Sequence, residues 1–127
     1  MQKKTILIIQ KLARKIMHLE EPLHIIAICS GGRTVAKEVV KFLKKNKIDT
    51  KYYEVWTNII DGKSVIWKTS FHKKNFDGTA IIIDDVIWQG RQIHPVKEML
   101  KKRNPTKKFY IASLLDCNKK ADFSVYN

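Results

Sequence analysis

The chain has 127 residues, of which 25 are lysine or arginine and 12 are aspartate or glutamate, so its formal net charge is +13. With 44% hydrophobic residues, 5 glycines and 3 prolines, the composition excludes a disordered tail and a fibrous chain, and no apolar run approaches the roughly 20 residues of a membrane span. The length predicts one domain, 1–127, and the lack of a secretory apolar core near Met1 predicts a cytoplasmic protein.

The first half of the chain alternates helix and strand. Apolar residues at helical spacing predict an amphipathic helix over about 4–19. The continuous apolar run 23–29 predicts a strand that is buried on both faces. After a break at the small residues 30–32, helical spacing predicts a second helix that ends at about Lys45.

The second half continues this alternation. Apolar runs predict four further strands, at 51–56, 79–84, 108–115 and 123–126. Residues 58–78 are polar, basic and irregular, with at most a short extra strand at 64–68. The spacing of Ile93, Val96 and Leu100 predicts a third helix. The pattern predicts an α/β fold, a single Rossmann-like domain whose central, mostly parallel sheet is flanked by helices.

Cysteine content and charge narrow the class of protein without naming a partner. Cys29 and Cys117 are too few for a disulfide framework and both fall in apolar runs, which predicts two buried thiols. The positive charge attracts nucleic acid, anionic membrane or small phosphorylated ligands. The lysines follow predicted helices without interleaved aromatic residues, which favours solvated helix faces over a nucleic-acid surface. A membrane partner is not expected.

Two predicted strand ends carry unusual residues, and ligands of such sheets bind at the carboxyl ends of strands. The first is CSGGRT, after the strand at 23–29. Its glycines let backbone N–H groups approach an anion, and the following helix N-terminus adds a partial positive charge. Taken alone, such a glycine turn is more often a plain connection, and the spacing of a P-loop is missing.

The second strand end is DDVIWQGRQ, which begins with Asp84 and Asp85. Paired aspartates can accept hydrogen bonds from a sugar diol or hold hydrated Mg²⁺. The turn at 89–92 can wrap a phosphate with backbone N–H groups at a helix N-terminus. The alternative is a solvated strand end followed by a helix cap. Four apolar residues before the acidic pair and an anion cradle after it favour a functional site.

The segment AIIIDDVIWQGRQIHPVKEML resembles the phosphoribosyl pyrophosphate (PRPP) binding motif of type I phosphoribosyltransferases. That motif has four apolar residues, two acids, two apolar residues, a variable position, Thr, Gly, any residue and Thr. IIAICSGGRTVAKEVV is similar to the family's pyrophosphate loop and its helix. ASLLDCNKKADFSVY is similar to a C-terminal segment of 6-oxopurine phosphoribosyltransferases and pyrimidine-operon attenuators. The resemblance implies the type I phosphoribosyltransferase fold, with a reduced C-terminal hood because the sequence ends at Asn127.

The resemblance also implies an activity and a set of site residues. It implies a Mg²⁺-dependent transferase of purine salvage that forms a homo-oligomer such as a dimer. The enzyme would move ribose 5-phosphate from PRPP to a nucleobase, with a purine as the expected acceptor, and release pyrophosphate. Asp84 and Asp85 would serve catalysis, the ribose hydroxyls and the metal. The 5′-phosphate would contact Gln89, Gly90, Arg91 and Gln92. The pyrophosphate would contact Ser30, Gly31, Gly32 and Arg33, and the base would contact Trp88 and Lys120. A mobile lid would span 61–75.

Departures from the family motif keep two alternatives open. Gln89 and Gln92 stand where the family has threonine, and their bulk can fill part of the phosphate pocket. Trp88 takes a position where many 6-oxopurine enzymes have an aspartate, and tryptophan cannot act as a general base. These features favour a catalytically weakened protein of the same fold that binds PRPP or a nucleotide as a sensor. An RNA-binding regulator that uses the +13 charge is the third hypothesis.

Overall fold

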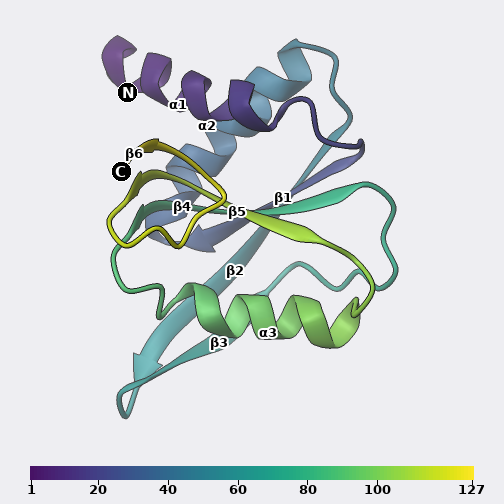
Figure 1. Cartoon of the computed structure of the whole chain (residues 1–127), viewed down its shortest axis with the longest axis vertical. Helices are drawn as coiled ribbons and strands as arrows, with labels where there is room; N and C mark the ends of the chain where they lie inside the picture. The colour runs from purple at the N-terminus through teal and green to yellow at the C-terminus, as the bar shows by residue number, and fades with distance from the viewer.

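A six-stranded sheet forms the centre of the computed structural model, which describes residues 1–127 (Figure 1). The strands are β1 (Leu23–Cys29), β2 (Thr50–Ile60), β3 (Lys63–Thr69), β4 (Thr79–Ile87), β5 (Phe109–Asp116) and β6 (Phe123–Tyr126). Their order is β3-β2-β1-β4-β5-β6, and β3 is antiparallel to its neighbour whereas all the other pairs are parallel. The predicted α/β fold with a mostly parallel sheet is confirmed.

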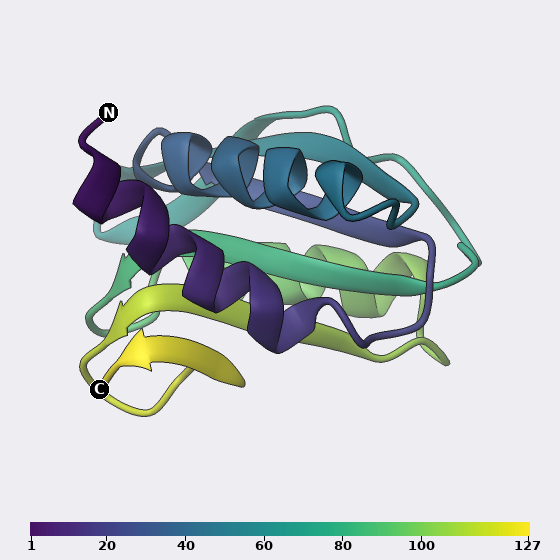
Figure 2. The same ribbon diagram turned by 90° about the horizontal axis from the view of Figure 1, so that it is seen from above.

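Three helices cover the two faces of this sheet (Figure 2). They are α1 (Lys3–Ile16), α2 (Gly31–Lys45) and α3 (Ile93–Arg103). Leu12 of α1 and Val39 of α2 pack on one face, whereas Val96 and Leu100 of α3 pack on the other. Because both faces are covered, every residue of β1 is buried, as its apolar run predicts. No helix combines the length and the apolar character that a membrane span requires.

A β-hairpin replaces much of the segment that was predicted to be irregular. β2 continues to Ile60, and β3 pairs with it in antiparallel register, Ile60 opposite Lys63. Asp61 and Gly62 connect the strands with φ angles of 52° and 76°, as in a two-residue turn that needs positive φ at both positions. The short extra strand predicted at 64–68 is confirmed as part of β3, whereas the irregular prediction was wrong for residues 58–60, which continue β2. The Asp-Gly turn signal outweighs local polarity here. Residues 63–69 of the expected lid are therefore strand, and the hairpin projects beyond the helices in Figure 1.

Strand β4 extends further than the predicted 79–84. It continues through Ile87, because its pairing with β5 runs on to Val86 opposite Leu115 and Ile87 opposite Asp116. The acidic pair thus lies within the strand rather than after its end. The first helix differs in the other direction and ends at Ile16 instead of at about residue 19.

The two cysteines have different environments. Cys29 is buried, as predicted, and burial raises the pKa of its thiol to about 11. Cys117 is exposed, so the prediction of a second buried thiol was wrong. The reason is that β5 ends at Asp116 and Cys117 begins the following loop.

This difference predicts the thiol chemistry of the native protein. We expect one thiol, Cys117, to react rapidly with an aromatic disulfide reagent at pH 8, and Cys29 to react only on unfolding, since a buried neutral thiol is a poor nucleophile. The measurement is the time course with which the protein thiols release the aromatic thiolate of the reagent, in buffer and in denaturant. Cys117→Ser removes the rapid phase; a rapid phase that survives in this variant would contradict the assignment.

Candidate functional site

The loops after β1, β4 and β5 lie at one edge of the sheet, since these strands are parallel neighbours (Figure 1, left-hand side). The loop after β1 carries the CSGG segment, and β4 carries the acidic pair near its end. The loop after β5 carries Lys120. The topology therefore gathers segments that are far apart in the sequence, as the strand-end argument requires.

Two glycines bring the start of α2 directly against β4. A Cβ atom on Gly32 would lie 2.5 Å from the carbonyl oxygen of Ile83 and 3.1 Å from Cα of Asp84. A Cβ on Gly31 would lie 2.8 Å from Oδ1 of Asp85. At Gly32 the neighbouring atoms belong to the backbone of β4, so only glycine permits this approach, and the first predicted strand end lies directly beside the acidic pair.

The two aspartates of this site are in different environments. Asp84 is buried, and its Oδ1 accepts the N–H of Asp85 at 2.9 Å. Burial, together with hydrogen bonding to and charge repulsion from the neighbouring Asp85 carboxylate, raises the pKa of Asp84 to about 8. Asp85 is partly exposed, and its Oδ1 accepts the N–H of Val86 at 2.8 Å. In the free protein, the Asp84 carboxyl is thus largely protonated at neutral pH, and an approaching cation would displace this proton.

The turn after β4 encloses a cavity of about 270 Å³. It is lined by Asp84, Val86, Ile87, Trp88, Gln89, Gly90, Arg91, Gln92, Ile93 and, from the hairpin, Ile59. Gln89 and Gln92 thus line this space rather than fill it completely. Helix α3 begins next to this turn with no side-chain cap and no acidic residue in its first turn. The N–H of His94 donates to the carbonyl of Gly90 at 3.2 Å and Pro95 has no N–H, so the first turn offers the N–H of Ile93 to an anion.

Lys120 and Trp88, the two residues expected at the base, line a second cavity of about 550 Å³ together with Gln89. The indole of Trp88 is 66% exposed, so it is free to stack on a planar ligand. Lys120 also borders the outer side of the turn at 89–92, beside Gly90 and Arg91. The two residues expected at the base are thus adjacent to the turn at 89–92.

Asp116, which the sequence analysis did not single out, holds the loop that carries Lys120. Its buried carboxylate accepts the N–H of Lys120 and the N–H of Ala121, both at 2.9 Å. Asp116 is the last residue of the apolar strand β5, much as the acidic pair lies near the end of β4, and this signal was present in the sequence. Asn118 donates to the carbonyl of Trp88 and links the two loops, which no local pattern indicated.

Asp116→Ala is expected to lower the free energy of unfolding by about 2–3 kcal/mol, because two partly buried hydrogen bonds to a buried carboxylate are lost. The measurement is urea unfolding. Asp122→Ala removes the matched acceptor of a single N–H, that of Ile111, and should cost less. Equal stability of Asp116→Ala and the wild type would show that the loop does not depend on this carboxylate.

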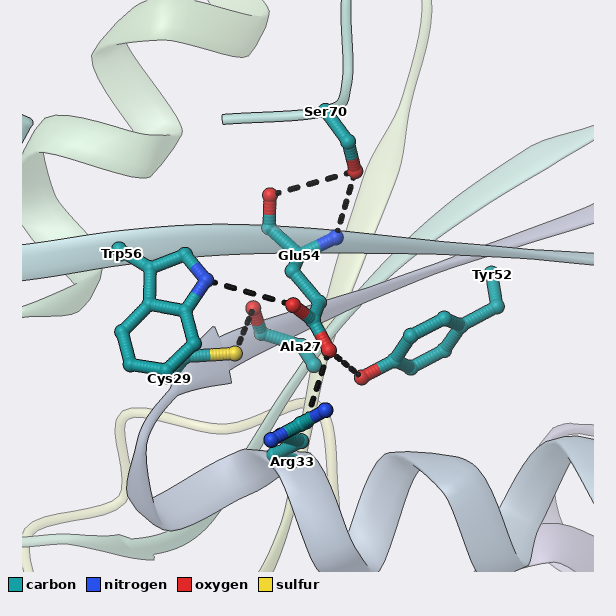
Figure 3. A network of polar contacts seen from close by, with 7 residues as sticks. All are labelled: Ala27, Cys29, Arg33, Tyr52, Glu54, Trp56 and Ser70. Atoms are coloured by element: carbon teal, nitrogen blue, oxygen red, sulfur yellow. Dashed lines mark hydrogen bonds and ion pairs between the residues drawn. The ribbon is translucent and has the colours of Figure 1, made fainter. Parts of the chain in front are cut away.

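Arg33, which was predicted to bind pyrophosphate, lies in the first turn of α2 but pairs with β2. Its Nε donates to Oε2 of Glu54 at 3.0 Å (Figure 3). The structure thus brings Ser30, Gly31 and Gly32 to the acidic pair, whereas it directs the Arg33 side chain toward Glu54.

The donor set of the site is compatible with Mg²⁺. No group of three or more His, Cys, Asp or Glu side chains could hold a metal ion by itself. Asp84 and Asp85 supply two adjacent carboxylates, and Mg²⁺ is usually held by one or two carboxylates together with substrate phosphates and water. The residues present therefore fit a magnesium ion that binds together with a phosphorylated ligand.

A mostly parallel sheet whose strand ends carry a glycine-rich loop and an acidic pair is typical of α/β proteins that bind phosphorylated sugars or nucleotides. The chain belongs to the phosphoribosyl transferase domain family, whose model matches residues 2–127. The search of curated proteins returned no match.

Solved structures support the same fold. A purine phosphoribosyltransferase from Pyrococcus horikoshii Ot3 matches with a TM-score of 0.78 at 24% identity, over 99% of this chain and 84% of that one. A hypoxanthine-guanine phosphoribosyltransferase from Bacillus anthracis matches with a TM-score of 0.79 at 18% identity, over 98% and 77%. A hypoxanthine phosphoribosyltransferase from Staphylococcus aureus has a TM-score of 0.78 at 18% identity, over 98% and 74%. At these identities the likeness establishes the fold.

Proposed function

We propose that the protein transfers ribose 5-phosphate from PRPP to a purine base, with release of pyrophosphate, in purine salvage. The observation that carries the proposal is the contact of Gly31 and Gly32 with β4 beside Asp84 and Asp85. The loop at 30–32 thus lies next to a pair of carboxylates, one of which, Asp84, also lines the cavity after β4. Family membership supports the transferase class, and the names of the structural neighbours support a purine acceptor.

Each part of PRPP has a matching feature in the proposed complex. The 5′-phosphate would lie in the cavity at Gln89, Gly90, Arg91 and Gln92, at the uncapped start of α3. The ribose hydroxyls would donate to Asp84 and Asp85. The pyrophosphate would lie at Ser30, Gly31 and Gly32, at the start of α2, which also has no acidic residue in its first turn.

The protein would contribute mainly positioning and charge stabilisation. A base nitrogen attacks the anomeric carbon, a C–N bond forms, and the C–O bond breaks with its electron pair leaving on pyrophosphate. When bound, Mg²⁺ supplies positive charge that stabilises the pyrophosphate leaving group. Asp84 and Asp85 would orient the ribose hydroxyls, and the N-terminus of α2 would stabilise the departing charge. No covalent nucleophile is required.

The base would lie between Trp88 and Lys120. The exposed indole offers a stacking surface, and the Lys120 ammonium offers a donor to an exocyclic oxygen. Trp88 cannot accept the proton of the attacking nitrogen, so that proton would pass to water or to the departing pyrophosphate.

The test is release of pyrophosphate from PRPP and Mg²⁺ with hypoxanthine, guanine, adenine or uracil as acceptor. The expected result is turnover with a purine, at least 100-fold faster than with Asp85→Asn, since the ribose would lose one of its two carboxylates. Glu98→Gln, which removes an exposed carboxylate from α3, is the control and should retain full activity. No turnover with any base, in a protein that binds PRPP, would contradict the enzymatic proposal.

That contradictory result would support the second candidate function, a sensor that binds PRPP or a nucleotide without turnover. The observation that favours a sensor is the replacement of both phosphate-turn threonines by Gln89 and Gln92, together with the lack of a general base at Trp88. Such a protein would bind PRPP through the same aspartates and show no pyrophosphate release.

A further inference from the structure

Glu54 of β2 is the centre of a polar network behind the loop between β1 and α2 (Figure 3). Its Oε2 accepts the Tyr52 hydroxyl at 2.7 Å and Nε of Arg33 at 3.0 Å, and its Oε1 accepts the Trp56 indole N–H at 3.3 Å. Residues 52, 54 and 56 alternate along the strand and so present their side chains to the face covered by α2. The Glu54 side chain is 23% exposed. The three hydrogen bonds to its carboxylate restrict the orientation of this group.

The backbone of Glu54 is fixed as well. Its N–H donates to Oγ of Ser70 at 2.9 Å, and its carbonyl accepts the N–H of Ser70 at 2.9 Å. Ser70 directly follows β3, so the Glu54 backbone is held between β1 and the end of β3. A carboxylate on such a rigid strand can position a neighbouring group accurately.

Arg33 is the group that this carboxylate holds. It is the third residue of α2, and its backbone N–H donates to the carbonyl of Ser30 at 3.2 Å. A cation is unfavourable at a helix N-terminus, and α2 has no acidic residue in its first turn to offset it. Glu54 supplies the missing negative charge from another element and draws the guanidinium toward β2.

The restraint on Arg33 extends to the loop that faces the acidic pair. Ser30, Gly31 and Gly32 lie between Arg33 and Asp85, with Gly31 in contact range of the Asp85 carboxylate. Arg33 belongs to the same helical turn as Gly31 and Gly32, so its ion pair with Glu54 ties this turn to β2. The Tyr52 hydrogen bond, followed by those of Trp56 and Arg33, holds the pKa of Glu54 below its ordinary value, so the carboxylate is charged at neutral pH.

We propose that Glu54 is a positioning residue for the pyrophosphate group of PRPP and acts through Arg33, so that Arg33 is a tether of the loop rather than a pyrophosphate ligand. This inference rests on the proposed function, because it concerns the affinity of the same site. It predicts an effect on ligands that carry pyrophosphate and none on ligands that lack it. A merely structural role of the network would affect both kinds of ligand.

The test is a double-mutant cycle of Arg33→Met and Glu54→Met, with calorimetric titration of PRPP and of ribose 5-phosphate in the presence of Mg²⁺. Each single variant is expected to lose about tenfold in PRPP affinity, as is typical when a supporting residue is removed. The double variant should lose no more than either single variant, since both changes break one connection. The affinity for ribose 5-phosphate should stay within about twofold of the wild type. Glu98→Met, on α3, is the matched control.

Several results would overturn the inference. If Arg33 contacts pyrophosphate directly, Arg33→Met weakens PRPP binding whereas Glu54→Met leaves it unchanged or strengthens it. Additive losses would show that the two residues act separately, and an equal loss for ribose 5-phosphate would show a general structural effect. A wild-type protein that binds neither ligand would instead contradict the proposed function itself, so the two failures are distinguishable.

Discussion

Asp84→Asn is expected to make the free protein more stable above neutral pH while it abolishes PRPP binding. The carboxyl has an ordinary pKa of 3.8, and burial raises it to about 8 in the folded protein. Between these values the folded state holds a proton that the unfolded state has released, so the stability of the wild type falls as the pH rises from about 4 to about 8. The neutral amide removes this dependence, and the variant should be more stable by several kcal/mol at pH 9.

The measurement is urea unfolding of both proteins from pH 3.5 to pH 9. The two proteins should be nearly equal at pH 3.5, where the carboxyl is neutral in the folded state and mostly neutral in the unfolded state, and should diverge as the pH rises. Asp49→Asn, at an exposed position before β2, is the control and should follow the wild type. Parallel profiles for Asp84→Asn and the wild type would contradict the raised pKa of the buried carboxyl.

Gly32→Ala is expected to have the largest destabilising effect of a single methyl group in this site. The new Cβ would lie 2.5 Å from the carbonyl oxygen of Ile83, which belongs to the central strand β4 and cannot move aside. Helix α2 would have to shift away from the sheet, at a cost of about 3 kcal/mol. We expect this loss in denaturant unfolding, together with a loss of PRPP binding in calorimetry.

Gly31→Ala is the matched comparison. Its Cβ would lie 2.8 Å from Oδ1 of Asp85, which is the end of a side chain that can rotate. The stability should therefore change by less than about 1 kcal/mol, whereas ligand affinity should still fall because Asp85 is displaced. Equal destabilisation by the two alanines would show that the approach of α2 to β4 is looser than the structure indicates.

The parts of the fold that follow from local pattern could be predicted from the sequence. The apolar run of β1 predicted a strand, because a strand buried on both faces has a continuous apolar sequence. The helical spacing of apolar residues predicted α2 and α3, because each of these helices is buried on one face. The acidic pair stood out for the same reason, since charge after four apolar residues is unusual.

Other features depend on contacts that no local pattern contains. The continuation of β4 to Ile87 results from pairing with β5, and the burial of Asp84 follows from it. The pairing of Arg33 with Glu54 joins residues that are 21 positions apart on a helix and a strand. The hairpin was the exception, since its Asp-Gly turn was visible in the sequence, but the basic and polar residues around it pointed to a loop.

The central claim is that the loop after β1, the acidic pair and the turn after β4 together form one PRPP site. Calorimetric titration of PRPP in the presence of Mg²⁺, with the wild type and with the Asp84→Asn/Asp85→Asn double variant, tests this claim most directly. The account predicts saturable binding to the wild type and a loss of at least 100-fold in affinity for the variant, whose fold should be intact because Asp84→Asn is stabilising. Absence of binding to the wild type at millimolar PRPP, or equal binding by the two proteins, would contradict the account.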